Sequence, residues 1–438
     1  MKGVEQMLIV EGGARISGCC RVHRAKNAVL PILAASLLCD SKVVLPDLPD
    51  LSDLAVTKQL LSELKMGVTE QCRDLILSPD DLAYSRLDEK LTAKLRASTL
   101  FLGPMLARFG KVTFGGSGGC AIGKRPIDLH LYGLAKLGAQ IKQEGNAITL
   151  SAETGLKGAD IRLRYPSVGA TENILMAASL AKGRTALSGG AAEPEVLDLV
   201  RFLNRCGAKI ETDGAGNYQI LGQKRLHGCC FFVMPDRIEA ATYLAAAAAT
   251  GGEILLTFDG ELALPLIGEL FEIMGCRVLS AKGGLALVQR GRLSAPRRLT
   301  TLPYPGFPTD LQAVFTTLCA LAKGQTVIRE TVFEERFSHL SQLQKMGAEI
   351  TVCGREAVIF GVKELFGTEI TIPDLRAGGG LLVAALAARG ESRLSALSYV
   401  DRGYDQLYEQ LSLCGARIKK MRCEDGKGTS RPDDPCRV

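Results

Sequence analysis

The feature of this sequence that most constrains its fold is an internal repeat. A short phrase recurs along the chain: an apolar residue, a glycine, a small residue, any residue, and then Ile or Val. The first copy, Met66-Gly67-Val68, is degenerate, and the six glycines are Gly67, Gly138, Gly207, Gly275, Gly347 and Gly415. They are separated by 71, 69, 68, 72 and 68 residues. Six copies in phase identify a chain built from six similar units.

Each unit carries a second marker, a helix of small residues that ends at a glycine and leads into a strand. The expected helix ends are Gly110, Gly183, Gly252, Gly324 and Gly390, because glycine suits the positive φ of a helix C-cap. Each unit is therefore predicted to run helix–strand–strand–helix–strand. Small residues, as in segment 240–249, let helices pack closely, so we expect buried helices with sheets outside. Six units are too many to share one hydrophobic core. We therefore expect two α/β domains with three units in each.

The composition excludes several functional classes. The 14 cysteines are scattered without a C-x-x-C motif and only four histidines are present, so zinc and dithiol chemistry are not indicated. Such cysteines are typical of reduced thiols in a cytosol. The first residues lack the apolar run of a signal peptide, and the most apolar stretch, 240–250, is too short to span a bilayer. We therefore expect a cytoplasmic protein.

The charge pattern bears on possible partners. The net charge of +6 is mild, and the basic residues form no arm and are not interleaved with aromatic residues. Nucleic-acid binding is therefore unsupported, whereas a basic balance suits small anionic substrates. No membrane or protein partner is indicated.

Polar residues gather where the small-residue helices begin. Asp236 and Asp374 are expected to be N-caps, because Asp favours that position. Thr309 and Gln312 match a capping box, which leaves Asp310 spare for another role.

Two of these helices open on a cation. Lys26 and Arg96 stand at predicted helix starts, where a positive charge opposes the helix dipole. A nearby anion supplies a reason for such cations. Lys26 and Arg96 are therefore candidate binding residues.

The richest glycine segment, 115–126, carries Cys120 beside Lys124 and Arg125. It nearly matches a Walker A motif, but Arg125 stands where Ser or Thr must hold magnesium, which disfavours an NTP-hydrolysing loop. Nearby cations lower a thiol pKa and raise its reactivity. Cys120 is therefore the candidate reactive thiol, and the alternative is an unimportant surface cysteine.

Several stretches together resemble one family over almost the full length of the chain. They include Ala25-Lys26-Asn27-Ala28, Leu95-Arg96-Ala97-Ser98, Gly118-Gly119-Cys120-Ala121-Ile122-Gly123, Arg125-Pro126-Ile127-Asp128-Leu129-His130, Ser167-Val168-Gly169-Ala170-Thr171-Glu172-Asn173, Pro235-Asp236-Arg237-Ile238-Glu239, Phe307-Pro308-Thr309-Asp310, Glu330-Thr331-Val332-Phe333-Glu334, Asp374-Leu375-Arg376-Ala377 and Asp401-Arg402-Gly403-Tyr404. On these residues the chain resembles the UDP-N-acetylglucosamine 1-carboxyvinyltransferase family of enolpyruvyl transferases.

The resemblance implies a fold of two inside-out, barrel-like α/β domains with three units each. Residues 1–25 and 235–422 would form one domain, residues 26–234 the other, and residues 423–438 a disordered tail. It also implies a reaction, the transfer of the enolpyruvyl group of phosphoenolpyruvate to the 3′-hydroxyl of UDP-N-acetylglucosamine with release of phosphate. That reaction is the first committed step of peptidoglycan precursor synthesis, and it needs no metal or cofactor.

By position in the family pattern, Lys26, Arg125 and Arg402 would hold phosphoenolpyruvate, because a phosphate and a carboxylate need several cations. Cys120 would protonate the enol carbon, and its loop would close over the substrates. Asp310 would act as base on the sugar hydroxyl. Arg96 would contact substrate, and the alternative is that it only steadies the loop. The nucleotide sugar would be held by Asn27, Pro126, Ile127, Asp128, Leu129, Ser167, Val168, Gly169 and Val332, together with Arg125.

One departure from the family pattern is His23-Arg24, where Ser-Gly is usual. Glycine often marks a special backbone angle, so we expect strain at Arg24 and an effect on acceptor choice or rate. Two alternatives therefore stay open. One is transfer to another uridine nucleotide, and the other is a non-catalytic paralogue that binds nucleotide sugar.

Overall fold

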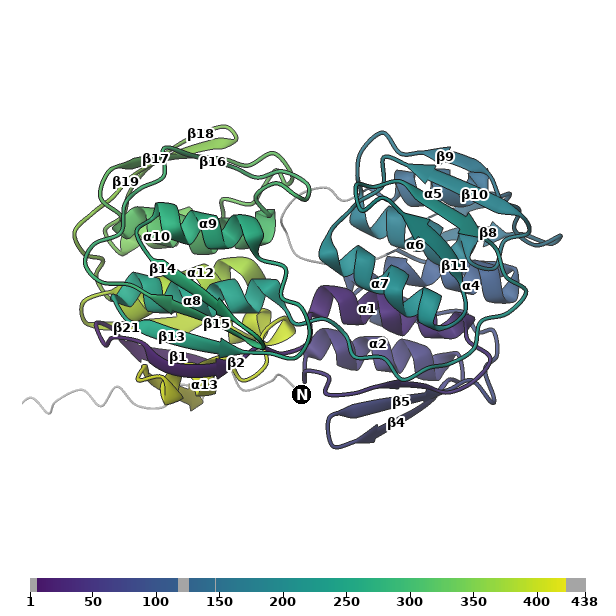
Figure 1. Ribbon diagram of the computed structural model, residues 1–438, viewed down its shortest axis with the longest axis horizontal. Coiled ribbons are helices and arrows are strands. Elements are labelled where there is room, and N and C mark those ends of the chain that lie inside the picture. The colour runs from purple at the N-terminus through teal and green to yellow at the C-terminus, as the bar shows by residue number, and fades with distance from the viewer. Residues whose placement is uncertain (1–5, 117–125, 146, 423–438) are drawn as a thin grey trace, which may run out of the picture.

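The computed structural model describes residues 6–116, 126–145 and 147–422. The chain forms two domains side by side (Figure 1). Their buried hydrophobic residues fall into two clusters. One draws on residues 8–22 and 238–416, and the other draws on residues 25–234.

Among the residues that the structure describes, the domain at the left of Figure 1 has three four-stranded sheets. Its strands are β1 (Gln6–Glu11), β2 (Ser17–Arg21), β13 (Glu253–Thr257), β14 (Arg277–Ala281), β15 (Gly284–Val288), β16 (Arg298–Thr300), β17 (Gln325–Arg329), β18 (Glu349–Cys353), β19 (Glu356–Phe360), β20 (Glu369–Thr371), β21 (Glu391–Ser395) and β22 (Arg417–Arg422). The sheet orders are β20-β21-β1-β22, β14-β15-β13-β2 and β16-β17-β19-β18. The N-terminal strands β1 and β2 thus complete two sheets that the second half of the chain begins.

Over the described residues, the other domain has one four-stranded and two three-stranded sheets. Its strands are β3 (Val43–Leu45), β4 (Gly67–Gln71), β5 (Asp74–Ser78), β6 (Lys111–Phe114), β7 (Gln140–Glu144), β8 (Ala147–Ser151), β9 (Asp160–Arg162), β10 (Arg184–Ser188), β11 (Lys209–Thr212) and β12 (Tyr218–Leu221). The sheet orders are β11-β12-β10-β9, β3-β5-β4 and β6-β8-β7.

The helices are of two kinds: those rich in small residues are almost wholly buried, and others expose one face to solvent. In the left domain they are α8 (Arg237–Thr250), α9 (Pro265–Ile273), η3 (Thr309–Leu311), α10 (Gln312–Leu321), α11 (Leu340–Lys345), α12 (Leu375–Ala387), η4 (Leu397–Arg402) and α13 (Leu407–Leu413). In the other they are α1 (Lys26–Ala35), η1 (Ser36–Leu38), α2 (Ser52–Glu63), α3 (Glu89–Thr92), η2 (Arg96–Phe101), α4 (Leu102–Phe109), α5 (Asp128–Lys136), α6 (Val168–Ala178) and α7 (Pro194–Arg205). Here η denotes a short 3-10 helix.

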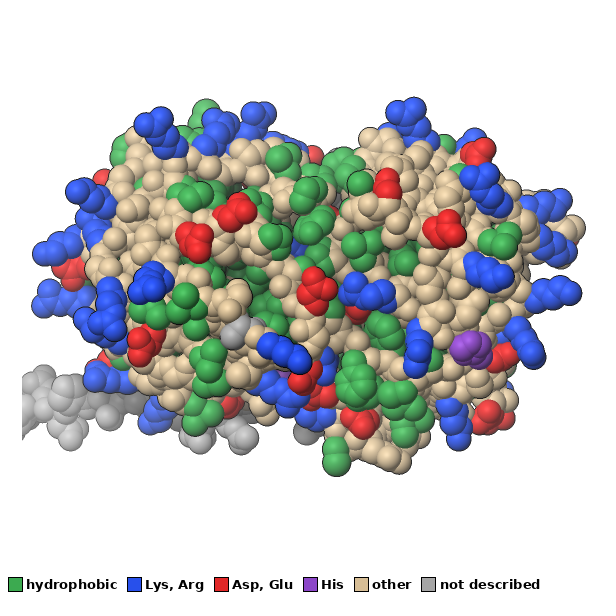
Figure 2. Space-filling model, in the orientation of Figure 1, with side chains coloured by type: hydrophobic (Ala, Val, Ile, Leu, Met, Phe, Trp, Pro, Cys, Tyr) green, Lys and Arg blue, Asp and Glu red, His purple; other side chains and the backbone are tan. Residues whose placement is uncertain are grey.

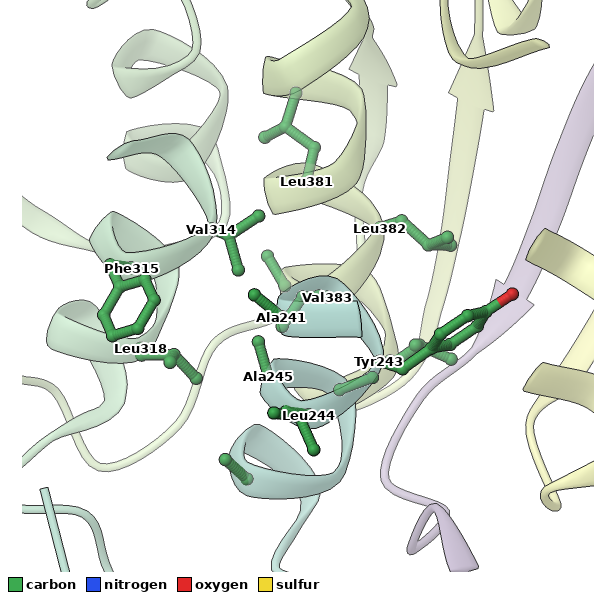
Figure 3. Close-up of a cluster of buried hydrophobic side chains, with 14 of the residues drawn as sticks. Ala241, Tyr243, Leu244, Ala245, Val314, Phe315, Leu318, Leu381, Leu382 and Val383 are labelled. Atoms are coloured by element: carbon green, nitrogen blue, oxygen red, sulfur yellow. The ribbon is translucent and has the colours of Figure 1, made fainter. Parts of the chain in front are cut away.

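Small residues let three helices meet at the centre of the left domain. Ala241 and Ala245 of α8 face Val314 of α10 and Val383 of α12 (Figure 3). A side chain at Gly380 would lie 2.6 Å from the carbonyl oxygen of Ala313, so glycine permits the close approach of α12 to α10. The prediction of buried helices and outer sheets is confirmed.

The repeated glycines occupy one turn of the unit. Gly138, Gly207, Gly275, Gly347 and Gly415 have φ between 93° and 99°, and each lies between a helix and the next strand. The prediction for the first copy is wrong by two residues. There Lys65 takes the left-handed turn with φ of 58°, and Gly67 already begins β4.

Two further expectations about the unit need correction. Gly251, with φ of 67°, caps α8 in place of Gly252, and helices α6, α10 and α12 end several residues before Gly183, Gly324 and Gly390. In three units a strand of three residues, β9, β16 or β20, precedes the small-residue helix and pairs in parallel with the strand that follows that helix. Strands of three residues carry too little periodicity to be recognised in sequence.

Within the described part of the chain, the backbone crosses between the domains twice, and the two crossings pair with each other. Arg24 and Pro235 form an isolated antiparallel bridge, the N–H of Asp236 donates to the carbonyl of His23 at 2.8 Å, and the N–H of Ala25 donates to that of Met234 at 2.8 Å. The expected strain at Arg24 is absent, because Arg24 is not among the described residues with positive φ.

On the face drawn in Figure 2, Lys and Arg are scattered over both domains and form no single basic patch. Within the described ranges, no helix has the length and hydrophobicity to cross a membrane.

Candidate active site

A cavity of about 660 Å³ lies between the two domains and is lined by both. It brings together most of the residues expected from sequence: Lys26, Asn27, Arg96, Pro126, Asp128, Leu129, Ser167, Val168, Gly169, Asp310, Val332 and Arg402. Ile127 does not line it and directly precedes α5. Cys120 and Arg125 lie outside the described residues. A second cavity, of about 530 Å³, contains none of the expected residues.

At one end of the cavity a buried carboxylate joins two cations. Lys26 begins α1, and its Nζ lies 2.6 Å from Oδ2 of Asp53, in the first turn of α2. Nε of Arg402, from η4 of the other domain, donates to Oδ1 of the same carboxylate at 2.9 Å. Burial lowers the pKa of Lys26, and Asp53 opposes that effect. Two cations thus share one carboxylate, which favours an anionic ligand beside them.

The helix start at Lys26 has a physical explanation. The N-cap residue, Ala25, offers no side-chain cap. Instead the backbone N–H of Lys26 donates to Oδ2 of Asp236 at 3.2 Å. Oδ1 of Asp236 meanwhile accepts from the backbone of Ile238 and Glu239 at the start of α8. The predicted N-cap at Asp236 is confirmed, and this one carboxylate anchors a helix in each domain.

Asp310 lies on the opposite wall, in η3. Its Oδ1 accepts from Arg336 at 2.9 Å and its Oδ2 from Arg376 at 2.8 Å. The Asn27 amide, from the other domain, lies 3.3 Å from Oδ2. Burial alone would raise the pKa of Asp310, but Arg376 and Arg336 hold it well below its ordinary range. The carboxyl group therefore stays ionised and accepts hydrogen bonds.

The predicted capping box at Thr309 is wrong. Pro308 is the N-cap of η3, and Oγ1 of Thr309 donates to Oε2 of Glu330 at 2.9 Å. Glu330 also accepts from the backbone N–H groups of Val332 and Phe333 at 2.8 and 3.0 Å. This buried carboxylate thereby fixes the loop that carries Val332 to the cavity. The predicted cap at Asp374 is confirmed, because it accepts from the backbone of Arg376 and of the next residue.

The third wall is the N-terminus of α6, which contributes Ser167, Val168 and Gly169. Ser167 caps the helix by accepting from the N–H of Ala170 at 3.5 Å. A Cβ at Gly169 would lie 3.0 Å from the His130 ring, a tight contact that glycine avoids. His130 is buried against Asn173 at 2.9 Å. Burial, and then the charge of Arg96, lower the pKa of His130 to about 4, so the ring is neutral.

Sequence reasoning missed several lining residues. Arg237 forms a buried ion pair with Glu195 at 2.8 Å. Glu172 and Glu193 each carry a buried carboxylate oxygen without a hydrogen-bond partner among the described residues, and burial raises the pKa of both. Asp53 gives no sequence signal, because it looks like any polar residue on an amphipathic helix.

Comparison with known proteins places this arrangement in a family. A family model described as EPSP synthase (3-phosphoshikimate 1-carboxyvinyltransferase) matches residues 10–411. The chain is 41% identical to the UDP-N-acetylglucosamine 1-carboxyvinyltransferase of Finegoldia magna, over 96% of this chain and 100% of that protein. It is 44% identical to the enzyme of the same name from Nitratidesulfovibrio vulgaris, over 94% and 99%.

Solved structures agree on the fold. The enolpyruvyl transferase NikO from Streptomyces tendae superposes with a TM-score of 0.86 at 24% identity, covering 96% of this chain and 100% of that one. EPSP synthase from Acinetobacter baumannii gives a TM-score of 0.74 at 19% identity, covering 95% and 100%. With a family model matched over nearly its whole length and full-length relatives above 40% identity, this chain belongs to the EPSP synthase family of enolpyruvyl transferases.

Proposed function

We propose that this enzyme transfers the enolpyruvyl group of phosphoenolpyruvate to the 3′-hydroxyl of UDP-N-acetylglucosamine and releases phosphate, the first committed step of peptidoglycan precursor synthesis. The observation that carries the proposal is the interdomain cavity, which combines a cationic end at Lys26 and Arg402 with an ionised acceptor at Asp310. The relatives that match this chain over almost their full length are named for this activity, which supports UDP-N-acetylglucosamine as the acceptor.

The donor would bind at the cationic end. Lys26 and Arg402 both contact Asp53 and bring two cationic groups together, which suits the phosphate and carboxylate of phosphoenolpyruvate. The resemblance adds Arg125, which lies outside the described residues. Arg96 lines the same cavity and would contact substrate there.

The nucleotide sugar would bind across the domain boundary. Asn27 and residues 126–129 and 167–169 come from one domain, while Asp310 and Val332 come from the other. The amide of Asn27 and the carboxylate of Asp310 are already within 3.3 Å. A sugar hydroxyl that lies beside both groups could donate to the carboxylate and accept from the amide.

The reaction requires the hydroxyl O–H to add across the double bond of phosphoenolpyruvate, with oxygen bonding C2 and a proton reaching C3. Loss of phosphate from C2 and of a proton from C3 then restores the double bond. We assign delivery of the C3 proton to Cys120. Asp310 has too low a pKa to take the hydroxyl proton early. We therefore propose that it orients the hydroxyl and accepts the proton as the new C–O bond makes that hydroxyl acidic.

The same proposal includes the domain division and the cellular setting. The two hydrophobic clusters support one domain of residues 1–25 and 235–422 and another of residues 26–234. We propose that the enzyme works in the cytoplasm on small molecules, without metal, cofactor or nucleic acid.

Phosphate release by the purified protein tests the function. With phosphoenolpyruvate and UDP-N-acetylglucosamine together, phosphate should appear, and omission of either substrate should abolish it. Lys26→Ala should remove the activity, while Lys58→Ala, which alters a lysine of α2 paired with Glu70 outside this cavity, should retain it. Release that is independent of the nucleotide sugar would overturn the proposal.

A further inference from the structure

The two residues that depart from the family pattern, His23 and Arg24, sit on the first crossing between the domains. Val22 belongs to one hydrophobic cluster and Ala25 to the other. Both crossing residues are largely buried, with side-chain exposures of 10% and 5%. Lys26 of the proposed site follows directly, so the conformation of this segment determines where one wall of the cavity stands relative to the other.

The Arg24 guanidinium contacts both domains. Nη1 donates to the carbonyl of Val233 at 3.1 Å, beside the second crossing, and to the carbonyl of Asp259 at 2.9 Å in the left domain. Nε lies 3.6 Å from the carboxylate of Asp47 in the other domain. The guanidinium also stacks over Phe232, 5.6 Å from the ring centroid. One side chain thus joins the two crossings and both domains.

His23 makes a parallel set of contacts. Its N–H donates to Oε2 of Glu239 at 2.8 Å, and its Nδ1 lies 2.8 Å from Oε1 of the same carboxylate, which belongs to α8. Its Nε2 lies 3.8 Å from Asp405. Asp405 in turn accepts from Arg73 at 2.6 Å and from the N–H of Asp50 at 3.1 Å, both in the other domain.

We infer that His23 and Arg24 are positioning residues, a clasp across the paired crossings that holds the two domains in the relative position that the interdomain site requires. Serine and glycine offer neither an imidazole nor a guanidinium, so they could make none of these side-chain ion pairs. The inference deepens the proposed function and rests on it for its kinetic consequence, but the clasp itself is a property of the ligand-free protein.

The clasp depends on pH through His23. Burial opposes protonation of the ring, but the hydrogen bond and charge of Glu239, with the charge of Asp405, outweigh burial and raise the pKa of His23 above 6.5. Arg73 partly opposes this increase. Burial raises the pKa of Glu239, the hydrogen bond and charge of His23 lower it, and the charge of Asp236 raises it. The hydroxyl of Tyr243 also donates to the Glu239 carboxylate at 3.3 Å. A raised folded pKa means that the stabilisation is complete below about pH 6.5 and is lost as pH rises through the folded value.

Amide hydrogen exchange of the ligand-free, full-length protein tests the clasp. Two groups report on it: the N–H of His23, bound to Glu239, and the N–H of Asp236, bound to the carbonyl of His23. His23→Ser and Arg24→Gly should each lower protection of residues 22–26 and 233–237 about tenfold or more, the scale of a charged hydrogen bond. Arg24→Lys should keep only part of this protection, because lysine lacks the planar, forked guanidinium group.

Matched controls separate the clasp from charge alone. Arg21→Ala removes a half-exposed arginine that contacts the same Asp47 and Asp259 at 2.7 and 3.4 Å. His227→Gln removes an exposed histidine of the other domain. Both should leave the protection of the crossings unchanged.

If His23→Ser fails to fold, the inference is tested with His23→Gln and with the pH dependence of exchange in the wild-type protein. Protection of the crossings, corrected for intrinsic exchange, should fall in the wild type as pH rises above 6.5 and be independent of pH in His23→Gln. Crossings equally protected in wild type, His23→Ser and Arg24→Gly would overturn the inference, even if the enzyme is active. In the kinetic arm, KM should rise with pH in the wild type alone and kcat should change little. Absence of any turnover would count against the proposed function only.

Discussion

Asp53→Asn probes the charge balance at the cationic end of the cavity. The Asp53 carboxylate lies 2.6 Å from Lys26 and 2.9 Å from Arg402, and the three side chains are 7%, 8% and 20% exposed. Removing one member of a buried ion pair costs about 3–5 kcal/mol. Asparagine keeps some hydrogen bonding, and Lys26 can lose its proton, so we expect about 3 kcal/mol.

At about 2–4 °C per kcal/mol for a domain of some 200 residues, that cost lowers Tm by about 6–12 °C. Glu70→Gln is the matched control. It breaks an exposed ion pair between Glu70 of β4 and Lys58, which lies on the same helix, α2, as Asp53. This variant should lose less than about 1 kcal/mol of stability. Differential scanning calorimetry measures both changes.

Inorganic phosphate provides a second reading of the same variant. An anion at this site can replace the lost negative charge, so phosphate should raise the Tm of Asp53→Asn more than that of the wild type. The reasoning is refuted if Asp53→Asn unfolds as the Glu70→Gln control does, or if phosphate stabilises both proteins equally.

Four further outcomes are expected. Asp310→Asn should lower kcat about 100-fold or more with nucleotide-sugar affinity largely kept, as kinetics and calorimetry would show; unchanged turnover would remove its catalytic role. Cys120→Ser should abolish alkylation by the epoxide fosfomycin in mass spectra, and continued alkylation at the site would contradict the assignment. Gly169→Val should cost about 1–3 kcal/mol by overpacking His130, seen in urea unfolding; wild-type stability would argue against the contact. Burial lowers the pKa of His339 to about 4, so stability held above pH 6.5 is lost as pH falls toward 4. In His339→Leu, the fall in unfolding free energy between pH 6.5 and 4 should be smaller by on the order of 2 kcal/mol. The same fall in both proteins, measured by urea unfolding at each pH, would contradict this.

The fold was largely predictable because its markers are local. Gly138 and its counterparts each need a left-handed turn at one place in the unit, and small residues such as Ala241 and Ala245 signal close helix packing. The three-residue strands before α6, α10 and α12 were not predictable, since their pairing with a parallel neighbour is set by tertiary contacts. Lys65 shows the same limit, because a turn under tertiary constraint tolerates a residue that is not glycine.

The site was predictable only in part. Lys26 and Asp310 stood out because each contradicts a simple capping role, and both line the cavity. The prediction that Thr309 caps its helix was wrong, because its hydroxyl donates to the carboxylate of Glu330, 21 residues away in sequence. Asp53, Arg336 and Arg376 carry no distinctive pattern, and their importance depends on which distant charges the fold brings within hydrogen-bonding distance.

His23 and Arg24 illustrate a different limit. Their departure from the family pattern was visible in the sequence, but strain was the wrong expectation. The backbone at Arg24 has no positive φ, and the guanidinium is held by carbonyls and carboxylates from both domains. Only the three-dimensional arrangement shows that the substitution adds contacts.

The central claim is most directly tested by isolating the nucleotide product formed from phosphoenolpyruvate with UDP-N-acetylglucosamine, another uridine nucleotide sugar, or shikimate 3-phosphate in separate reactions. Mass spectrometry and NMR should show one enolpyruvyl group added to the 3′-oxygen of UDP-N-acetylglucosamine, with the other acceptors turned over far more slowly. Preferential reaction of either other acceptor, or tight binding of UDP-N-acetylglucosamine without any product, would contradict the claim.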